Sequence, residues 1–341
     1  MKKNLLLTTI ILSLLFSLTA CGNFGASSDK KDSKDNASSS AKPSGDAITV
    51  TIGDQPSFFL LKIADEKGFF KDEFAKDNIT IQVESFVKQG SAIVEAMAAG
   101  DVDLGIIGSL PFVSANANGN KLVALCSANY SKDGFKLIVQ GDSAITSVKQ
   151  LKGKTVATKF ASNEHQMLLT LLSKAGLSAE NVNIVNMSSS DGLSAFETGD
   201  VDAILPNGQT LNAALSAGGT VIADNSQTGI ITNSLVGREE FVKKYPEITS
   251  RIIKVLERAK KYIDENKEEA IKIGAKQADV SIENATVSFE SRERSITVDD
   301  DIFLEPIEQA IQFSVQQKMI DQTIPSDDII DTSYYIAAGI K

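Results

Sequence analysis

Cysteine, histidine and the larger aromatic side chains are scarce in this chain. Its 341 residues include two cysteines, one histidine, five tyrosines and no tryptophan. Two cysteines exclude a disulfide-rich scaffold and a cysteine-bound metal cluster. A nucleophilic triad needs a base, and the single histidine, His165, has no nearby cysteine or elbow serine to activate. The sequence therefore predicts no catalytic residue, no metal and no cofactor, and we expect that the protein is not an enzyme.

Positive charge is also in deficit. Lysine and arginine together number 34 against 44 acidic residues, which gives a formal net charge of -10. A surface of this sign repels phosphate backbones. Nucleic acid is therefore not an expected partner.

The chain begins with a segment typical of exported proteins. Two lysines follow Met1, and the run from Leu5 to Leu18 is almost entirely apolar. At about 1.5 Å per helical residue, this run is too short to cross a hydrocarbon core of about 30 Å comfortably. We interpret residues 1–20 as a signal peptide. The small residues before Cys21 indicate a lipoprotein cleavage site, and plain secretory cleavage near Ala20 is the alternative.

Residues 21–46 are predicted to be a lipidated cysteine and a disordered tether. Their Ser, Lys, Asp, Ala, Asn and Gly offer too little apolar surface to offset the entropy of folding. Acyl chains on Cys21 would hold the protein at the outer face of the cell membrane, which predicts an extracytoplasmic location. Cys126 is then left without a disulfide partner and is expected to be a small buried apolar residue.

A pattern of helix, glycine and strand occurs twice. Residues 96–103 and 195–202 both contain Gly-Asp-Val-Asp after a helical stretch and before an apolar strand. The glycine suits a left-handed helix cap. The two carboxylates alternate across a strand start without further ligands at calcium-loop spacing, so we read them as structural.

Around these repeats, predicted strands alternate with predicted helices. This alternation favours an α/β fold with two lobes, right-handed crossovers and mostly parallel sheets. We assign residues 47–130 plus 230–341 to lobe 1 and residues 131–229 to lobe 2. The chain would cross between the lobes twice, and paired crossings form a two-segment hinge.

Loops that follow the carboxyl ends of strands gather at one edge of an open sheet, where ligands bind. In both lobes these loops are rich in neutral hydrogen-bond donors, and several precede helices, whose N-termini suit an oxyanion without a dedicated arginine. Candidate ligand-binding residues are Gln55, Ser57, Gln89, Ser91, Ser109, Ser162, Asn163 and Asn207. The alternative for each serine is that it only caps its own helix.

Three further residues are candidates with open alternatives. His165, in the first turn of a predicted helix, would be a neutral donor because the helix dipole disfavours its protonated form, or it would be an exposed or packed histidine. Phe58 and Phe160 would shield an apolar tail of the ligand, or they would belong to the core.

The chain resembles the substrate-binding proteins of ATP-driven importers for nitrate, sulfonate, taurine and bicarbonate. The resemblance rests on residues 142–157, the turn at residues 162–165, the two Gly-Asp-Val-Asp steps and Tyr245-Pro246-Glu247. It implies the type II periplasmic-binding-protein fold. It also implies anion contacts from the first-strand loop, the Gln89-Gly90-Ser91 turn, Gly108-Ser109 and the Ala161-Ser162 turn.

The resemblance further implies a function. We expect a monomeric receptor that captures a small organic anion and delivers it to the permease and ATPase of an ABC importer. An aliphatic sulfonate or taurine-like ligand is favoured, because phenylalanines could cover a short tail. The alternatives are nitrate or bicarbonate, a thiamine pyrimidine precursor, or a biosynthetic enzyme on the same fold.

Overall fold

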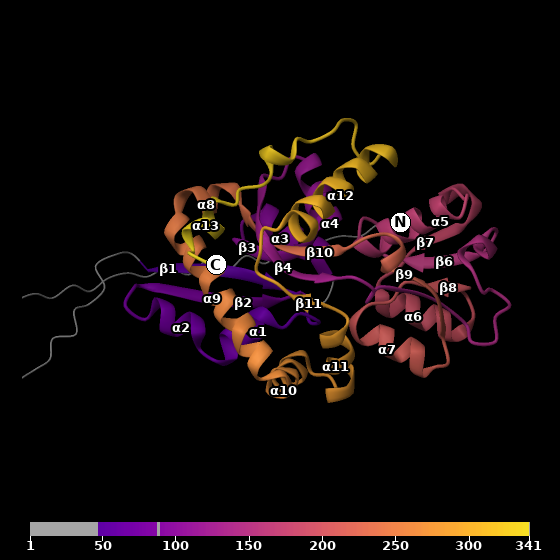
Figure 1. Cartoon of the computed structure of the whole chain (residues 1–341), viewed down its shortest axis with the longest axis horizontal. Coiled ribbons are helices and arrows are strands. Elements are labelled where there is room, and N and C mark those ends of the chain that lie inside the picture. Colours follow the sequence, from indigo (N-terminus) through magenta and orange to yellow (C-terminus); the bar gives the residue numbers. More distant parts are fainter. Residues whose placement is uncertain (1–46, 87–88, 341) are drawn as a thin grey trace, which may run out of the picture. The chain divides into compact units, whose positions relative to one another are not determined.

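The computed structural model describes residues 47–86 and 89–340. The predicted signal peptide (1–20), the lipidation site Cys21 and the tether (21–46) lie outside these residues. The described residues form two β-sheets flanked by helices (Figure 1). Among these residues, no helix has both the length and the apolar character that a membrane crossing requires.

The larger sheet has six strands: β1 (Ile48–Asp54), β2 (Ile79–Ser85), β3 (Leu104–Gly108), β4 (Leu122–Ser131), β10 (Ile231–Arg238) and β11 (Glu293–Arg294). Their order is β11-β4-β10-β3-β1-β2. β1 is parallel to β2 and β3, whereas β10 is antiparallel to β3 and β4, and β11 is antiparallel to β4. Every residue of β4 is buried, as expected for a strand covered on both faces.

The smaller sheet has five strands: β5 (Lys136–Val139), β6 (Thr155–Thr158), β7 (Asn183–Asn186), β8 (Ala203–Ile204) and β9 (Thr220–Asp224). Their order is β7-β6-β8-β5-β9. β6 is parallel to β7 and β8, whereas β5 is antiparallel to β8 and β9.

The α/β fold is confirmed, but the sheets are mixed. The prediction of mostly parallel sheets holds for part of each sheet only, because β10 and β11 in the larger sheet and β5 in the smaller sheet run against the other strands. β5 and β10 are the first strands after the chain passes from one sheet to the other. Each therefore enters its sheet at the edge where the parallel strands have their carboxyl ends, and it runs against them.

Helices cover both faces of the larger sheet (Figure 1). One face packs on α1 (Leu60–Glu66), α2 (Phe69–Phe74), α9 (Pro246–Glu265) and α10 (Lys267–Ala278). The other face packs on α3 (Gln89–Ala99), α4 (Ser109–Ala117) and α12 (Glu305–Gln316). The smaller sheet carries α5 (Asn163–Lys174), α6 (Ser189–Thr198) and α7 (Gly208–Ser216), and the remaining helices are α8 (Glu239–Lys244), α11 (Ile282–Glu290) and α13 (Ser333–Ala337).

The two Gly-Asp-Val-Asp segments have the same structural role. Gly100 and Gly199 have φ of 88° and 79°, the left-handed conformation that a helix cap requires. Asp103 then accepts the backbone N–H of Thr51 at 3.0 Å, and Asp202 accepts that of Thr155 at 2.8 Å. Each carboxylate therefore ties the start of its own strand to the neighbouring parallel strand, β1 in the larger sheet and β6 in the smaller sheet.

One buried asparagine joins the two segments that connect the sheets. The Asn225 side chain accepts the Phe135 N–H at 3.0 Å and donates to the Ser131 carbonyl at 2.8 Å. It also donates to the Gly229 carbonyl at 3.3 Å. Asn225 is fully buried, so these bonds are shielded from water.

A buried ion pair lies where β1 leads into the first loop. Asp54 is fully buried and Lys62 is 3% exposed, and the ammonium of Lys62 donates both to Asp54 and to the Gln55 carbonyl, the latter at 2.9 Å. Burial raises the pKa of the Asp54 carboxyl, and the charge of Lys62 opposes this rise. The pair therefore fixes the start of the loop that carries Gln55.

Replacing Lys62 with methionine should destabilise the protein strongly. The substitution leaves the Asp54 carboxyl buried without its cation, which costs about 3–5 kcal/mol. A second substitution, Asp54→Asn, should restore most of this loss because it removes the uncompensated charge. Urea denaturation followed by circular dichroism measures both effects. Lys260→Met, which removes a surface pair with Asp264, is the control and should cost less than about 1 kcal/mol. A loss of similar size for Lys62→Met would contradict the prediction.

Candidate functional site

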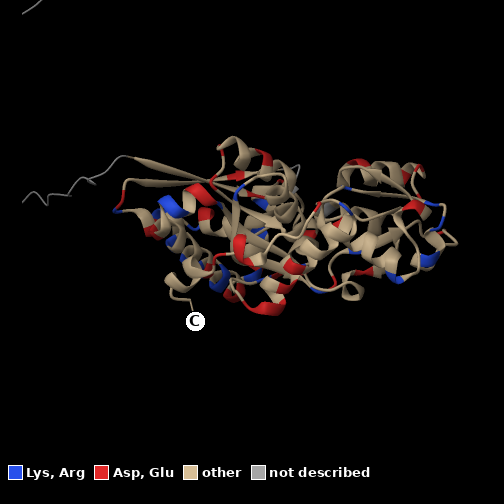
Figure 2. Ribbon diagram, turned by 90° about the horizontal axis from the view of Figure 1, so that it is seen from above, with Lys and Arg blue, Asp and Glu red and all other residues tan. Residues whose placement is uncertain are grey.

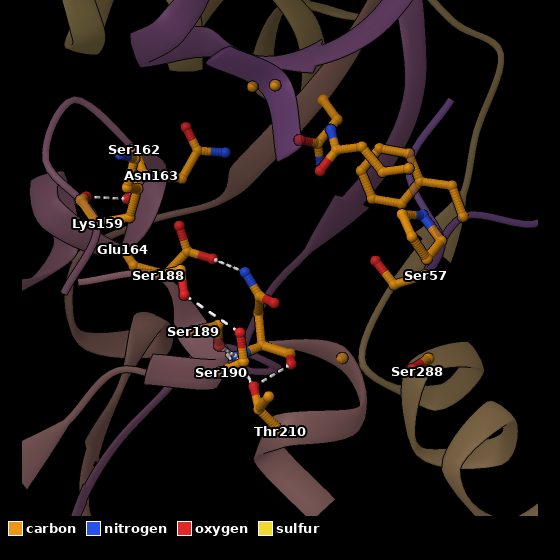
Figure 3. Close-up of a pocket in the computed structure, with 18 of the residues that line it drawn as sticks. Ser57, Lys159, Ser162, Asn163, Glu164, Ser188, Ser189, Ser190, Thr210 and Ser288 are labelled. Atoms are coloured by element: carbon orange, nitrogen blue, oxygen red, sulfur yellow. Dashed lines mark hydrogen bonds between the residues drawn. The ribbon is translucent and has the colours of Figure 1, made fainter. Parts of the chain in front are cut away.

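A cleft of about 800 Å³ lies at the carboxyl ends of strands from both sheets (Figure 3). From the larger sheet, the loop after β1 and the end of β3 contribute to its wall. From the smaller sheet, the loops after β6, β7 and β8 contribute. The edge predicted from the strand pattern is therefore the edge where the cavity lies.

Several helices begin at this cleft. α4, α5, α6 and α7 have Gly108, Ser162, Ser188 and Asn207 as their N-caps, and all four residues line the cavity. The first backbone N–H groups of a helix have no partner within the helix, and they carry part of the positive end of its dipole. Their convergence favours a negatively charged ligand group.

Most of the predicted ligand-binding residues line this cavity. They are Gln55, Ser57, Phe58, Gly90, Ser91, Gly108, Ser162, Asn163 and Asn207. The side chain of Gln89 lies outside the described part of the structure. Their roles in ligand binding stay a prediction.

Four predicted residues are not part of the cavity wall: Ser109, Phe160, Ala161 and His165. Ser109 is buried and donates to the Thr232 carbonyl at 3.4 Å. Phe160 is 41% exposed and stacks on His165, with 4.8 Å between ring centroids. Ala161 adopts φ of 55° and forms the turn before α5. Sequence position alone cannot tell which side of a turn faces the cavity.

Ser162 is engaged in local hydrogen bonds. Its hydroxyl donates to the Lys159 carbonyl at 2.6 Å and accepts the His165 N–H at 3.2 Å. The capping alternative for this serine therefore describes its side chain in the structure. Burial lowers the pKa of His165, which keeps the imidazole neutral near pH 7.

Arg292 is the main residue of the cavity that the sequence did not predict. It is 8% exposed, and its guanidinium carbon lies 5.4 Å and 5.1 Å from the ring centroids of Phe58 and Phe135. It donates to the Ser291 hydroxyl at 3.0 Å, whereas its Nε has no hydrogen-bond partner among the described residues. Burial lowers the pKa of Arg292 to about 10, so the guanidinium is still charged at pH 7. The sequence pattern indicated no arginine in this cavity, whereas the structure places Arg292 in its wall.

Glu164 is the second unpredicted charge. It is 7% exposed, lines the cavity and accepts a hydrogen bond from the Asn207 amide at 2.7 Å (dashed in Figure 3). Sequence reasoning included Glu164 in the helix that follows Ser162 but gave it no contact with ligand. Its position in the first turn, beside the predicted Ser162 and Asn163, was the available signal.

Hydroxyl groups make up much of the remaining wall. Figure 3 shows Ser188, Ser189 and Ser190 on one side of the cavity and Ser57 and Ser288 on another. Ser189 accepts the backbone N–H of Asn207 at 3.1 Å and lies 2.5 Å from the Thr210 hydroxyl. The loop after β7 was predicted to face the ligand, whereas no sequence pattern indicated Ser288.

The two halves of the cleft touch each other at several points. A Cβ atom added to Gly108 would lie 2.4 Å from the Asn163 amide nitrogen. The Asn212 amide on α7 donates to the Asn284 side chain on α11 at 2.5 Å. Only a residue without a side chain fits at position 108 while Asn163 keeps this place.

Residues 55–270 match the model of a protein family described as NMT1/THI5 like. The chain belongs to this family. A protein of Bacillus subtilis (strain 168), named for binding aliphatic sulfonates, is 29% identical over 342 residues, which cover 98% of this chain and 96% of the relative. The taurine-binding periplasmic protein of Escherichia coli (strain K12) is 29% identical over 212 residues, covering 61% of this chain and 64% of that protein.

Solved structures confirm the periplasmic-binding-protein fold. The alkanesulfonate-binding protein SsuA from Xanthomonas axonopodis pv. citri, bound to MOPS, superposes with a TM-score of 0.76 at 20% identity, covering 84% of this chain and 99% of that one. The desulfurization enzyme DSZB superposes with a TM-score of 0.66 at 15% identity, covering 85% of this chain and 98% of that one. The sequence relatives described above are thus named as binding proteins, whereas the fold also occurs in an enzyme.

Replacing Ser162 with alanine should lower the free energy of unfolding by about 1 kcal/mol, because α5 loses its N-cap. Ser188, which caps α6 by accepting the Asp191 N–H at 3.2 Å, is a matched control, and Ser188→Ala should cost a similar amount. Chemical denaturation measures both losses. Unchanged stability in Ser162→Ala would show that its hydroxyl does not act as a cap.

Proposed function

We propose that this protein is an extracytoplasmic receptor that captures an aliphatic sulfonate in the cleft and delivers it to an ABC importer. The observation that carries this proposal is the Arg292 guanidinium, which is buried in the cavity without a carboxylate within 4.0 Å among the described residues. A buried unpaired charge is costly, and an anionic ligand would offset that cost.

A sulfonate fits this chemistry. It has three acceptor oxygens, which can bind the guanidinium, the helix N-termini and the hydroxyls of the wall together. Phe58 and Phe135 flank Arg292 and offer apolar surface to an alkyl group. The two relatives named for aliphatic sulfonates and taurine support the same ligand class.

Ligand capture without turnover is the proposed activity. Among the described residues, the one thiol and the one imidazole are not part of the cavity wall: Cys126 is fully buried on β4 of the larger sheet, and His165 lies in the first turn of α5. Burial raises the pKa of the Cys126 thiol well above its usual range, which disfavours the reactive thiolate. These features support a binding protein over an enzyme of the same fold.

Two lobes that close around the ligand complete the proposal. We assign residues 47–130 and 230–341 to lobe 1 and residues 131–229 to lobe 2, and we propose that the protein acts as a monomer. Support comes from the two segments that connect the sheets, which Asn225 holds side by side. A change of backbone angles within these segments would move one sheet relative to the other.

Replacing Arg292 with glutamine should weaken the binding of taurine and ethanesulfonate by about 30-fold or more, because the anion loses its buried cationic partner. Isothermal titration calorimetry measures the affinities. Arg292→Lys should retain part of the binding, and Arg258→Gln, which removes a surface arginine paired with Asp72, should leave it unchanged. Wild-type binding should also weaken above about pH 10, where the guanidinium of the free protein loses its proton.

If the wild-type protein binds neither sulfonate but is stabilised by nitrate, bicarbonate or a thiamine precursor, the proposed ligand class is wrong. Saturation at about one hundred times the dissociation constant should add about 2.7 kcal/mol to the free energy of unfolding. A thermal-shift screen therefore separates these alternatives.

We also propose that Cys21 carries the lipid that anchors the receptor. The full-length protein, expressed in a bacterium that processes lipoproteins, should be recovered with membranes and released by detergent. Cys21→Ser should be recovered without membranes, because acyl chains supply the anchoring. Cys126→Ala is the matched control and should stay with the membranes. Membrane recovery of Cys21→Ser would refute the anchor, whatever the ligand.

A further inference from the structure

The cleft contains two buried side chains of opposite charge. Arg292 directly precedes β11 of the larger sheet, and Glu164 lies in the first turn of α5, after β6 of the smaller sheet. Each is less than one-tenth exposed, and both line the same cavity. The negative charge of Glu164 also opposes the fall in the pKa of Arg292, so the two charges act on each other electrostatically.

The two charges nevertheless do not form an ion pair. Among the described residues, neither side chain has an oppositely charged group within 4.0 Å. One oxygen of Glu164 accepts the Asn207 amide at 2.7 Å. That bond does not neutralise the carboxylate, so the cavity keeps an uncompensated negative charge on one side and an uncompensated positive charge on the other.

A ligand with only a negative charge would satisfy half of this arrangement. Its sulfonate would pair with Arg292, but an unsubstituted alkyl tail would leave the buried Glu164 carboxylate without a cation, and the negative ligand would be repelled by it. Such an uncompensated charge discriminates between ligands, because only a ligand that brings the missing charge removes the penalty.

We propose that the ligand is a zwitterion, an aminoalkanesulfonate whose sulfonate binds Arg292 and whose ammonium group binds Glu164. This inference rests on the proposed function and specifies the ligand class of the same cleft. Glu164 is then a specificity-determining residue, and Asn207 positions its carboxylate. Phe58 and Phe135 would pack against the alkyl spacer beside the sulfonate.

The test compares two sulfonates of the same carbon length by titration calorimetry on the full chain at pH 7.5. Taurine carries an ammonium group, and ethanesulfonate does not. The wild-type protein should bind taurine about 30-fold or more tightly, the fold-change expected for a buried charge pair. Glu164→Gln should reduce taurine affinity by a similar factor and change ethanesulfonate affinity less than about threefold, because glutamine keeps the oxygen that accepts the Asn207 amide.

Glu180→Gln is the matched control, because Glu180 is exposed and is not part of the cavity wall, and it should leave both affinities unchanged. Equal or tighter wild-type binding of ethanesulfonate would overturn the inference without any variant and would leave the proposed function intact. An equal loss for both ligands in Glu164→Gln would also overturn it, since Glu164 would then support the cleft and not the ammonium group. Failure of wild-type protein to bind either sulfonate would refute the proposed function itself.

Discussion

The guanidinium of Arg292 is buried beside two aromatic rings and has no carboxylate within 4.0 Å among the described residues. The stability of the free protein and the chemistry of the cleft both depend on how this charge is stabilised. Water reaches little of Arg292, which is 8% exposed, and its Nε has no hydrogen-bond partner among the described residues. The desolvation cost of such a group is several kcal/mol, so the rest of the fold must support it in the free protein. The rings of Phe58 and Phe135 provide part of that support through cation–π contact, which is worth up to about 2 kcal/mol when desolvated. Under the proposed function, an anion bound in the cleft would supply the remainder.

The frame that holds this cleft depends on ties between segments far apart in the chain. The carboxylates of Asp103 and Asp202 accept backbone N–H groups of β1 and β6, which ties the starts of β3 and β8 to these neighbouring parallel strands. Asn225 joins the two connecting segments. The Asp54–Lys62 pair holds the first loop at Gln55. Asn225, Asp54 and Lys62 are buried, so breaking their hydrogen bonds would leave polar groups without partners away from water, at a cost in stability.

Local patterns predicted the elements that carry most of the cleft. The strand at residues 155–158 and the helix predicted for residues 164–175, observed as α5, follow from short-range propensities and glycine stops. The predicted alternation of strands and helices then placed the loops after the strands at one edge of each sheet, and the cavity lies at that edge. Strand direction was harder to predict, because β5 and β10 follow a passage of the chain from the other sheet, and no local sequence signal indicates this. Arg292 was missed for a related reason: it follows α11, outside both repeats, and only the packing of α11 and β11 brings it to the cavity. Glu164 was overlooked because a glutamate in the first turn of a helix is usually explained by the helix dipole alone.

The negative net charge of the protein affects which ligands can reach the two charged side chains of the cleft, Arg292 and Glu164. The chain has a formal charge of -10, and acidic positions are interspersed with basic ones on elements around both sheets (Figure 2). Near physiological salt, a purely anionic ligand is repelled by this surface only within about 8–10 Å, the screening length. Inside the cleft, the helix N-termini and Arg292 oppose that repulsion. A ligand with no net charge does not meet this repulsion, and under the proposal each of its ends pairs with a fixed charge of the cleft. An acidic surface and a cavity with one positive and one negative side chain can therefore occur in the same protein. The surface discriminates between ligands by their net charge, and the cavity discriminates by the positions of the charges within the ligand.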